Sequence, residues 1–279
     1  MNCVHHARLL FLENQGLGTR NVPRDIGMAS SSRADMPLES QCCSSAAMPI
    51  DSGLLAAMSD QYAFCYCEEN VFRAIELLSA ARRDLRTFAV ITSSFVAADP
   101  RLCFPGSWHR SCVVITTDRA GGTVAWDYHV FCVVLPPSGL RDAFVLDFDS
   151  ALCLGGTPGR LRASAPFADY VALTFRQCDV ATVRLRVVPG AEYLERFSST
   201  RAHMLPVGLR RKWLQDPERR AQCPPGNLLG QVPPGCPPIV RLAEAGGVDL
   251  AQLINMHPDN RDVPGKVLSV AEFAAGAFQ

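Results

Sequence analysis

Three side chains of this 279-residue sequence are of the types that carry out nucleophilic catalysis: Cys67, His129 and Asp147. A cysteine can attack as a nucleophile, a histidine can act as its general base, and a carboxylate can orient the histidine. Cys67 begins a segment with helical periodicity, whereas His129 and Asp147 fall in two consecutive segments typical of strands. If these strands pair, one ring nitrogen of His129 can bind Asp147 while the other faces the thiol.

Each of the three residues also has a purely structural interpretation. The sequence contains 12 cysteines, and a buried cysteine usually serves as a small hydrophobic side chain. A histidine in an apolar strand is often a core residue, and Asp147 has apolar neighbours of the same kind. Taken singly, each residue favours the structural interpretation, so the case for a thiol enzyme rests on their combination.

Metal and nucleotide chemistry have weaker support in the cysteine and glycine patterns. Cys65 and Cys67 form a C-x-C pair, with Cys42 and Cys43 upstream. Structural zinc sites prefer recurrent pairs separated by two to four residues, and no such pair recurs here. No glycine-rich phosphate-binding motif follows a predicted strand. We therefore expect neither a metal nor an organic cofactor.

A predicted helix over residues 68–83 must position the thiol. Apolar residues recur along one face of it at helical spacing: Val71, Phe72, Ile75 and Leu78. A helix N-terminus stabilises a thiolate through its unpaired N–H groups and its dipole. Glu68 and Glu69 lie in the same first turn and oppose that effect, so a nearby protonated histidine would be needed to hold the thiolate.

Two strands must position the histidine and the aspartate. Residues 123–135 and 143–148 are rich in β-formers and are separated by prolines and a Ser-Gly turn signal, which predicts an antiparallel hairpin. Further strands are predicted at 87–92, 112–116 and 181–188, and further helices at 190–198, 249–256 and 269–278. The last two helices open with the N-cap residues Asp249 and Ser269.

The domain organisation follows from changes in periodicity along the chain. Residues 1–58 lack sustained periodicity, which predicts a disordered N-terminal extension. Residues 59–279 are predicted to form a single catalytic domain. Within it, eight prolines between positions 206 and 238 indicate a Pro-rich insertion at about 205–248.

Composition excludes several classes of protein. Lys and Arg total 27, as do Asp and Glu, so no excess positive charge supports nucleic-acid binding. The longest apolar run, near residues 130–135, is far shorter than the roughly 18 residues of a membrane span. The cysteines lack regular spacing and no secretory signal is recognisable, so we expect a reducing compartment, the cytoplasm, with the nucleus as a second location.

Four motifs make the interpretation specific. CYCEEN at 65–70 and WDYHV at 126–130 resemble the cysteine and histidine motifs of the protein N-terminal glutamine amidohydrolase family. LDFDS at 146–150 resembles the family's aspartate motif, which usually has Leu where Phe148 stands. EYLERFSSTRAHM at 192–204 is similar to a family helix that ends in Arg-x-His-Met. The resemblance extends over roughly residues 61–279.

The resemblance implies a fold, an activity and a set of catalytic residues. The fold would be α+β and papain-like or transglutaminase-like, with the cysteine on a helix packed against an antiparallel sheet that carries His and Asp. The activity would convert N-terminal glutamine of proteins and peptides to glutamate with release of ammonia, a step that feeds the arginylation branch of the N-degron pathway. Carried over by motif, the nucleophile is Cys67, the base His129 and the orienting carboxylate Asp147. We expect a monomer that binds neither nucleic acid nor membrane.

Substrate selection requires a group that pairs with the free α-ammonium. Asp127 is the candidate from the sequence, because it lies two residues before His129 and so on the same face of a strand. The alternative is that Asp127 satisfies a nearby backbone group or an arginine.

The sequence departs from the family pattern in a longer N-terminal extension, an expanded segment at 97–122 and a longer Pro-rich segment, none of which removes a motif residue. Two rival functions use the same parts. One is another Cys-His-Asp enzyme, either a peptidase or a transglutaminase-type acyltransferase. The other is an inactive binding module of the same fold.

Overall fold

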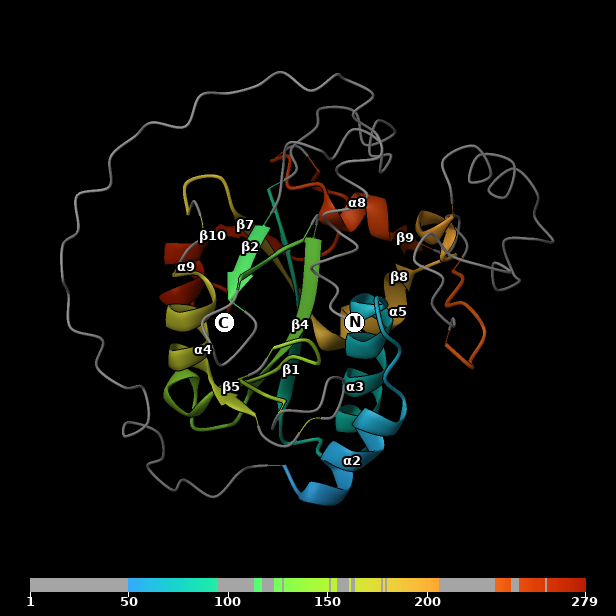
Figure 1. The fold of residues 1–279 in the computed structure, drawn as a ribbon, viewed down its shortest axis with the longest axis horizontal. Coiled ribbons are helices and arrows are strands. Elements are labelled where there is room, and N and C mark those ends of the chain that lie inside the picture. Colours follow the sequence, from blue (N-terminus) through green and yellow to red (C-terminus); the bar gives the residue numbers. More distant parts are fainter. Residues whose placement is uncertain are drawn as a thin grey trace, which may run out of the picture.

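A six-stranded antiparallel sheet with helices on both sides forms the centre of the molecule (Figure 1). Helices α2 and α3 run along one side of the sheet in this view, and α4 and α9 lie along the other. The computed structural model describes residues 50–94, 113–116, 123–126, 128–150, 152–154, 161, 164–176, 178, 180–205, 234–241, 246–258 and 260–279. The fold class is therefore α+β, as predicted.

The strand order in the main sheet is β10-β7-β1-β4-β5-β6. Its strands are β1 (Arg86–Ser93), β4 (Tyr128–Leu135), β5 (Phe144–Leu146), β6 (Ala165–Pro166), β7 (Arg184–Pro189) and β10 (Lys266–Ser269). A separate antiparallel pair joins β2 (Val113–Thr116) to β3 (Thr123–Trp126), and a short parallel pair joins β8 (Phe197–Ser198) to β9 (Val248–Asp249).

The helices are short apart from α3. They are α2 (Ser52–Asp60), α3 (Cys67–Ala81), α4 (Phe167–Thr174), α5 (Gly190–Arg196), α8 (Leu250–Ile254) and α9 (Val270–Ala274), with 3₁₀ turns η3 (Leu140–Asp142) and η4 (Ala202–Met204). The predicted apolar face of α3 is confirmed, because Val71, Phe72, Ile75 and Leu78 are all buried.

Strand β4 lies in the interior and carries His129. Every residue from His129 to Leu135 is buried, because β1 and β5 flank the strand and helices cover the sheet. Phe131, two residues beyond His129 on the same strand face, packs against Tyr170 of α4 and Phe273 of α9. These contacts hold strand β4 in place against α4 and α9, and the strand in turn positions the His129 side chain near its N-terminal end.

The predicted boundary of the disordered extension at residue 58 is wrong. Helix α2 begins at Ser52, is capped by the Asp51 side chain, and buries Leu55 and Met58 against the core. The helix has too few turns to show a sustained apolar period, so the sequence pattern missed it. The folded domain therefore includes Ile50 onward, and residues 1–49 lie outside the described part of the chain.

The segment 123–135, predicted as one strand, forms two. Strand β3 pairs with β2, whereas β4 belongs to the main sheet, and Asp127 between them lies outside the described residues. The hairpin of β4 and β5 is confirmed, with Cys132 opposite Leu146. Strand β5 ends at Leu146, so Asp147 follows the strand instead of lying within it.

The C-terminal helices carry the predicted caps but are shorter than predicted. Asp249 and Ser269 each accept a hydrogen bond from a backbone N–H in a complete capping box. Helix α4 and strand β10 were not predicted. Of the Pro-rich insertion at about 205–248, residues 205, 234–241 and 246–248 are described, and Ile239 bridges to Ser199.

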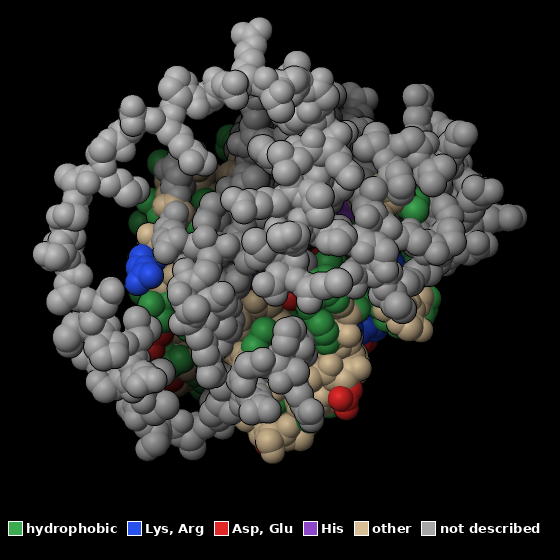
Figure 2. Space-filling view, viewed as in Figure 1, with side chains coloured by type: hydrophobic (Ala, Val, Ile, Leu, Met, Phe, Trp, Pro, Cys, Tyr) green, Lys and Arg blue, Asp and Glu red, His purple; other side chains and the backbone are tan. Residues whose placement is uncertain are grey.

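The described surface carries scattered charges. In the view of Figure 2, Lys and Arg side chains occur singly among hydrophobic and uncharged groups. Among the described residues, no helix has the length and apolar content that a membrane crossing requires.

Candidate active site

Cys67 is the first residue of α3, and the chain reaches it through a sharp bend. Cys65 adopts a left-handed conformation with φ of 68°, which is uncommon for a non-glycine residue. Asn70 holds the bend by accepting a hydrogen bond from Ala63 N and donating one to Ala63 O, both at 2.8 Å. The Asn of the CYCEEN motif therefore anchors the loop that delivers the thiol.

The β4–β5 hairpin brings His129 and Asp147 together. Nε2 of His129 lies 3.0 Å from both carboxylate oxygens of Asp147, and both side chains are buried. Tyr170 of α4 donates its hydroxyl to Asp147 Oδ2 at 2.6 Å, and the Asp149 N–H donates to Oδ1 at 2.9 Å. Three donors thus fix the carboxylate, and the carboxylate fixes the ring.

The His129–Asp147 pair changes the acid–base behaviour of both residues. Burial lowers the pKa of His129, but the charge and hydrogen bond of Asp147 outweigh burial, and the pKa of the imidazole rises above its usual value. Burial raises the pKa of Asp147, but His129 and Tyr170 outweigh it, so the carboxyl pKa falls. The carboxylate therefore stays ionised at neutral pH and holds a proton on Nε2.

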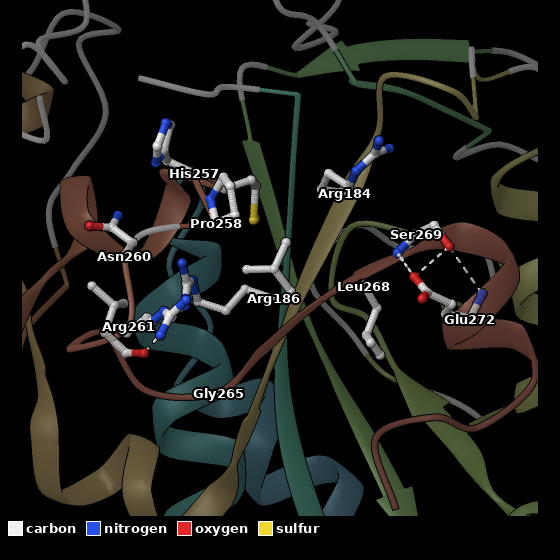
Figure 3. A pocket seen from close by; sticks show the side chains of 13 residues that line it. Arg184, Arg186, His257, Pro258, Asn260, Arg261, Gly265, Leu268, Ser269 and Glu272 are labelled. Carbon is white, nitrogen blue, oxygen red and sulfur yellow. Dashed lines mark hydrogen bonds between the residues drawn. The ribbon is translucent and has the colours of Figure 1, made fainter. Parts of the chain in front are cut away.

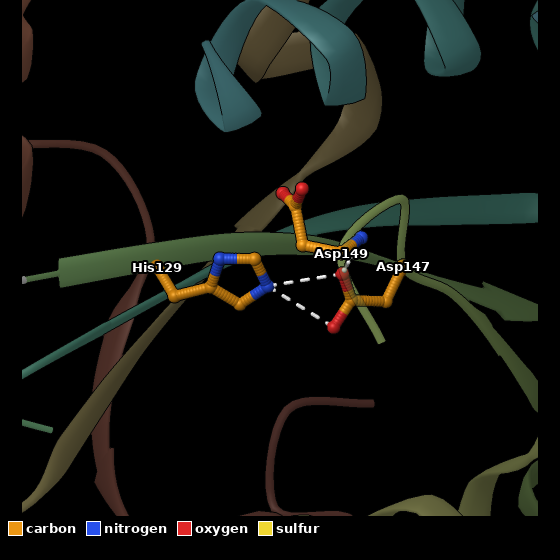
Figure 4. A group of neighbouring side chains, drawn as sticks. All are labelled: His129, Asp147 and Asp149. Atoms are coloured by element: carbon orange, nitrogen blue, oxygen red, sulfur yellow. Dashed lines mark hydrogen bonds and ion pairs between the residues drawn. The ribbon is translucent and has the colours of Figure 1, made fainter. Parts of the chain in front are cut away.

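The second ring nitrogen of His129 remains available. Nδ1 is buried and has no hydrogen-bond partner within the described part of the structure. Figure 4 shows it on the edge of the ring turned away from Asp147, on the side to which the Asp149 carboxylate projects. Because the Asp147 bond assigns the proton to Nε2, Nδ1 carries the lone pair that can accept a proton.

The Cys67 sulfur lies between β4 and the acidic first turn of its own helix. It hydrogen-bonds to the backbone of Val130, the residue after His129, and its thiol donates to Glu68 Oε2 at 3.6 Å. Burial raises the pKa of the thiol well above its usual value, and the charges of Glu68 and Asp149 raise it further. The expected opposition of the acidic turn to thiolate formation is thus present, and the sulfur is a neutral thiol at neutral pH.

Asp149, the second aspartate of the LDFD motif, lies close to the His129–Asp147 pair. Its Oδ1 accepts a hydrogen bond from Tyr62 at 2.8 Å, and burial raises its pKa. One donor atom each from His129, Asp147 and Asp149 lie within 4.8 Å of one another, which is compatible with a metal ion. The Asp147 oxygens already accept hydrogen bonds from His129, Tyr170 and the Asp149 N–H. The expectation of no metal is not tested by this arrangement and stays a prediction.

Two parts of the site escaped sequence reasoning. Tyr170 had no signal, because α4 was not predicted. The bidentate contact of Arg201 with Glu69, at 2.7 and 2.6 Å, joins residues 132 positions apart. The Arg-x-His-Met motif contained Arg201, but nothing in the motif indicated its partner.

The sequence candidate for the α-ammonium, Asp127, lies outside the described residues and stays a prediction.

A separate hollow of about 680 Å³ opens beside β7, α8 and β10 (Figure 3). Arg184, Arg186 and His257 line it, together with Ser269 and Glu272. No cysteine occurs among the described residues that line it, Cys67 included, so it is not the place where Cys67 would react.

Comparisons with known proteins point to one family. The family described as N-terminal glutamine amidase matches residues 62–277. A Drosophila melanogaster protein named protein N-terminal glutamine amidohydrolase is 30% identical over 238 residues, which cover 81% of this chain and 93% of that protein. A Caenorhabditis elegans protein of the same name is 29% identical over 158 residues, covering 54% of this chain and 72% of that protein.

Proposed function

This chain belongs to the N-terminal glutamine amidase family, and from that premise we propose that it deamidates N-terminal glutamine of proteins and peptides to glutamate and releases ammonia. The observation that carries the proposal is the family match over residues 62–277, which includes Cys67, His129 and Asp147. The oriented imidazole supports it, because a histidine with one nitrogen bound and one available is suited to serve as a general base.

The reaction proceeds by acyl transfer to sulfur. Cys67 passes its proton to Nδ1 of His129 as the sulfur attacks the side-chain amide carbon of the glutamine. A carbon–sulfur bond forms, the carbon–nitrogen bond breaks, and the proton on His129 leaves with ammonia. His129 then takes a proton from water, whose oxygen attacks the thioester; glutamate forms and the thiol is restored. Asp147 stabilises the imidazolium in both halves of the cycle.

We propose a papain-like or transglutaminase-like hydrolase fold. A thiol at a helix start and an imidazole on a strand beside a carboxylate support this proposal. Backbone N–H groups at the start of α3 are suited to hold the developing oxyanion. We further propose that the protein acts as a monomer in the cytoplasm, with the nucleus as a second location, and that its product enters the arginylation branch of the N-degron pathway.

The test is ammonia release from matched peptides. A peptide that begins with Gln should release ammonia, whereas one that begins with Asn and one with only internal Gln should be poor substrates. Peptide cleavage or crosslinking in place of ammonia would favour the peptidase or acyltransferase alternative, and no turnover of any substrate would favour the binding module.

A cysteine pair provides the matched control. Cys67→Ser should abolish measurable turnover, while Cys65→Ser should retain substantial activity, since only Cys67 begins the helix. The reverse result in folded variants would overturn the assignment of the nucleophile.

A further inference from the structure

Two adjacent glutamates in the first turn of α3 are buried in different surroundings. Glu69 is paired with Arg201, which donates to both of its carboxylate oxygens at 2.7 and 2.6 Å. Arg201 is itself 0% exposed, so this is a closed ion pair. Glu68 is also 0% exposed, but no arginine or lysine contacts it among the residues that the structure describes.

The Glu68 carboxyl group lies directly beside the thiol. Its Oε2 accepts from the Cys67 thiol at 3.6 Å and from the Tyr128 hydroxyl at 3.1 Å. Its Oε1 has no hydrogen-bond partner among the described residues, although Nε2 of His203 approaches to 3.4 Å. The Tyr193 hydroxyl donates to the Glu68 carbonyl at 3.1 Å and so fixes the backbone of this turn. A buried carboxyl with a spare oxygen is costly unless a ligand completes it.

The charge around the thiol is unbalanced in a way that disfavours its reaction. Glu68, Asp149 and Asp147 all raise the pKa of Cys67. A nucleophilic cysteine normally has cationic surroundings that lower the thiol pKa. An arriving cation would offset the carboxylates, and the proposed substrate brings one cation, its α-ammonium.

Covalent geometry allows a carboxylate at this position to orient the substrate. The α-nitrogen of glutamine lies at most about 5 Å from its side-chain amide carbon, because four single bonds join them. Oε2 of Glu68 lies 3.6 Å from the Cys67 sulfur. An ammonium bound to this carboxylate therefore allows the amide carbon to approach the sulfur to the roughly 3–3.5 Å from which attack occurs. Asparagine is one bond shorter, so the same anchor places its amide carbon differently relative to the sulfur.

We propose that Glu68, supported by the Tyr128 hydroxyl, binds the α-ammonium of the N-terminal glutamine and so restricts the enzyme to free N-termini. This inference rests on the proposed function, and it names the group that selects the substrate. The same contact brings positive charge next to Cys67, so that substrate binding favours ionisation of the thiol. In the free enzyme, burial and the charge of Glu69 raise the pKa of Glu68 to about 8, and binding an ammonium displaces its proton.

The first experiment compares Glu68→Gln with Glu76→Gln, an exposed glutamate of the same helix. With a Gln-initiated peptide, Glu68→Gln should lower kcat/KM by roughly 10²-fold, as expected for loss of one partner of a buried charge pair. Glu76→Gln should match the wild type. Thermal unfolding checks that both variants fold. If Glu68→Gln does not fold, Tyr128→Phe replaces it in the comparison, with an expected loss of roughly 10-fold in kcat/KM.

The second experiment tests whether the Glu68 carboxylate acts electrostatically on the Cys67 thiol, the coupling through which a bound ammonium would favour thiolate formation. Alkylation of Cys67 by iodoacetamide, followed by mass spectrometry across pH, reports thiolate formation. Among the described residues, the titratable groups that interact with Glu68 are Cys67 and Glu69 on α3, and Tyr128, His129, Tyr193 and His203 on other elements. Glu68→Gln removes one charge from this set. The alkylation midpoint should therefore move to lower pH in Glu68→Gln, although the same variant is the poorer enzyme. An unchanged midpoint would overturn the proposal.

The third experiment separates failure of this inference from failure of the proposed function. A Glu-initiated peptide should change the alkylation rate of wild-type Cys67, whereas the N-acetylated form of the same peptide should not. In Glu68→Gln the two peptides should have the same effect on the alkylation rate. This result without ammonia release would sustain the ammonium site and reject the deamidase. If instead Asp149→Asn or Asp127→Asn loses the discrimination and Glu68→Gln keeps it, Glu68 is the wrong acceptor.

Discussion

The surroundings of Arg186 and the first turn of α3 bury charge in contrasting ways. Arg186 on β7 is 1% exposed and donates to the carbonyl oxygens of Leu253, Asn255, Val263 and Pro264 at 2.9–3.4 Å. Burial lowers its pKa to about 10, so the guanidinium remains charged at neutral pH. These bonds tie the segment between α8 and β10 to the main sheet.

The first turn of α3 buries two carboxyl groups, and an arginine pairs with one of them. Glu69 has its arginine, whereas Glu68 has a thiol and a tyrosine hydroxyl on one oxygen and the His203 ring at 3.4 Å from the other, which forms no hydrogen bond among the described residues. The contrast teaches that a buried charge is not by itself a sign of function, because Arg186 is buried and fully hydrogen-bonded. What distinguishes the α3 turn is a buried carboxyl whose described cationic contact is a histidine, His203 at 3.4 Å, instead of an arginine, next to the proposed nucleophile.

The strongest test of this contrast is Arg201→Met, which would leave Glu69 as uncompensated as Glu68. Loss of one partner of a buried ion pair costs about 3–5 kcal/mol of unfolding free energy, or roughly 6–20 °C in Tm for a domain of this size. Calorimetry measures it, with Arg82→Met at an exposed pair as the control. Adding Glu69→Gln should recover part of the loss; no recovery would mean that packing, not charge, accounts for the effect.

Asp147→Asn tests whether the orienting carboxylate acts through charge. The variant keeps the shape but removes the charge that stabilises the imidazolium, and kcat should fall by about 10²–10³-fold, or about 3–4 kcal/mol. Stopped-time ammonia release measures it. Asp149→Asn is the matched control and should retain more activity. A normal Asp147→Asn enzyme together with a dead Asp149→Asn enzyme would reverse the two roles.

Raising the pH should expose the uncompensated state of Glu68. In the folded protein its pKa is about 8, well above the ordinary glutamate pKa of 4.5. The folded protein therefore holds a proton that the unfolded chain has lost, and this contribution to stability disappears as pH rises through 8. Between pH 6 and pH 9 the wild type should lose about 2–3 kcal/mol relative to Glu68→Gln, at about 1.4 kcal/mol per pH unit. Denaturant titrations at both pH values measure it; parallel curves would place the Glu68 pKa in its ordinary range.

Arg186→Met tests the second region of the comparison, the buried arginine of β7. It removes the guanidinium from four carbonyl oxygens, of which Asn255 O still accepts from Asn260 Nδ2 at 3.3 Å. It creates no unpaired charge, so the cost should be smaller, about 2 kcal/mol or roughly 4–8 °C in Tm. The kinetic constants of the folded variant should stay near those of the wild type. A selective fall in kcat at unchanged Tm would assign Arg186 and its pocket a part in the reaction.

The sequence alone indicated the elements whose signals are local. Two segments rich in β-formers, with turn signals between them, predicted the β4–β5 hairpin. The spacing of Val71, Phe72, Ile75 and Leu78 predicted the buried face of α3, and Asp249 and Ser269 marked their helix starts. It also singled out Cys67, His129 and Asp147. These features depend on neighbours within a few residues or on one short motif, and such information is present in the order of residues.

Other features depended on contacts between distant parts of the chain. Helices α2 and α4 have too few turns to show a sustained apolar period, and the sheet and α3 supply the surface against which they pack. Tyr170 reaches Asp147 from 23 positions away, and Arg201 reaches Glu69 from 132 positions away.

The sequence therefore placed two acids side by side at the start of α3 and gave no means to tell them apart. Only the tertiary structure decided that the second receives an arginine and the first faces the thiol, because electrostatic compensation depends on distance in space.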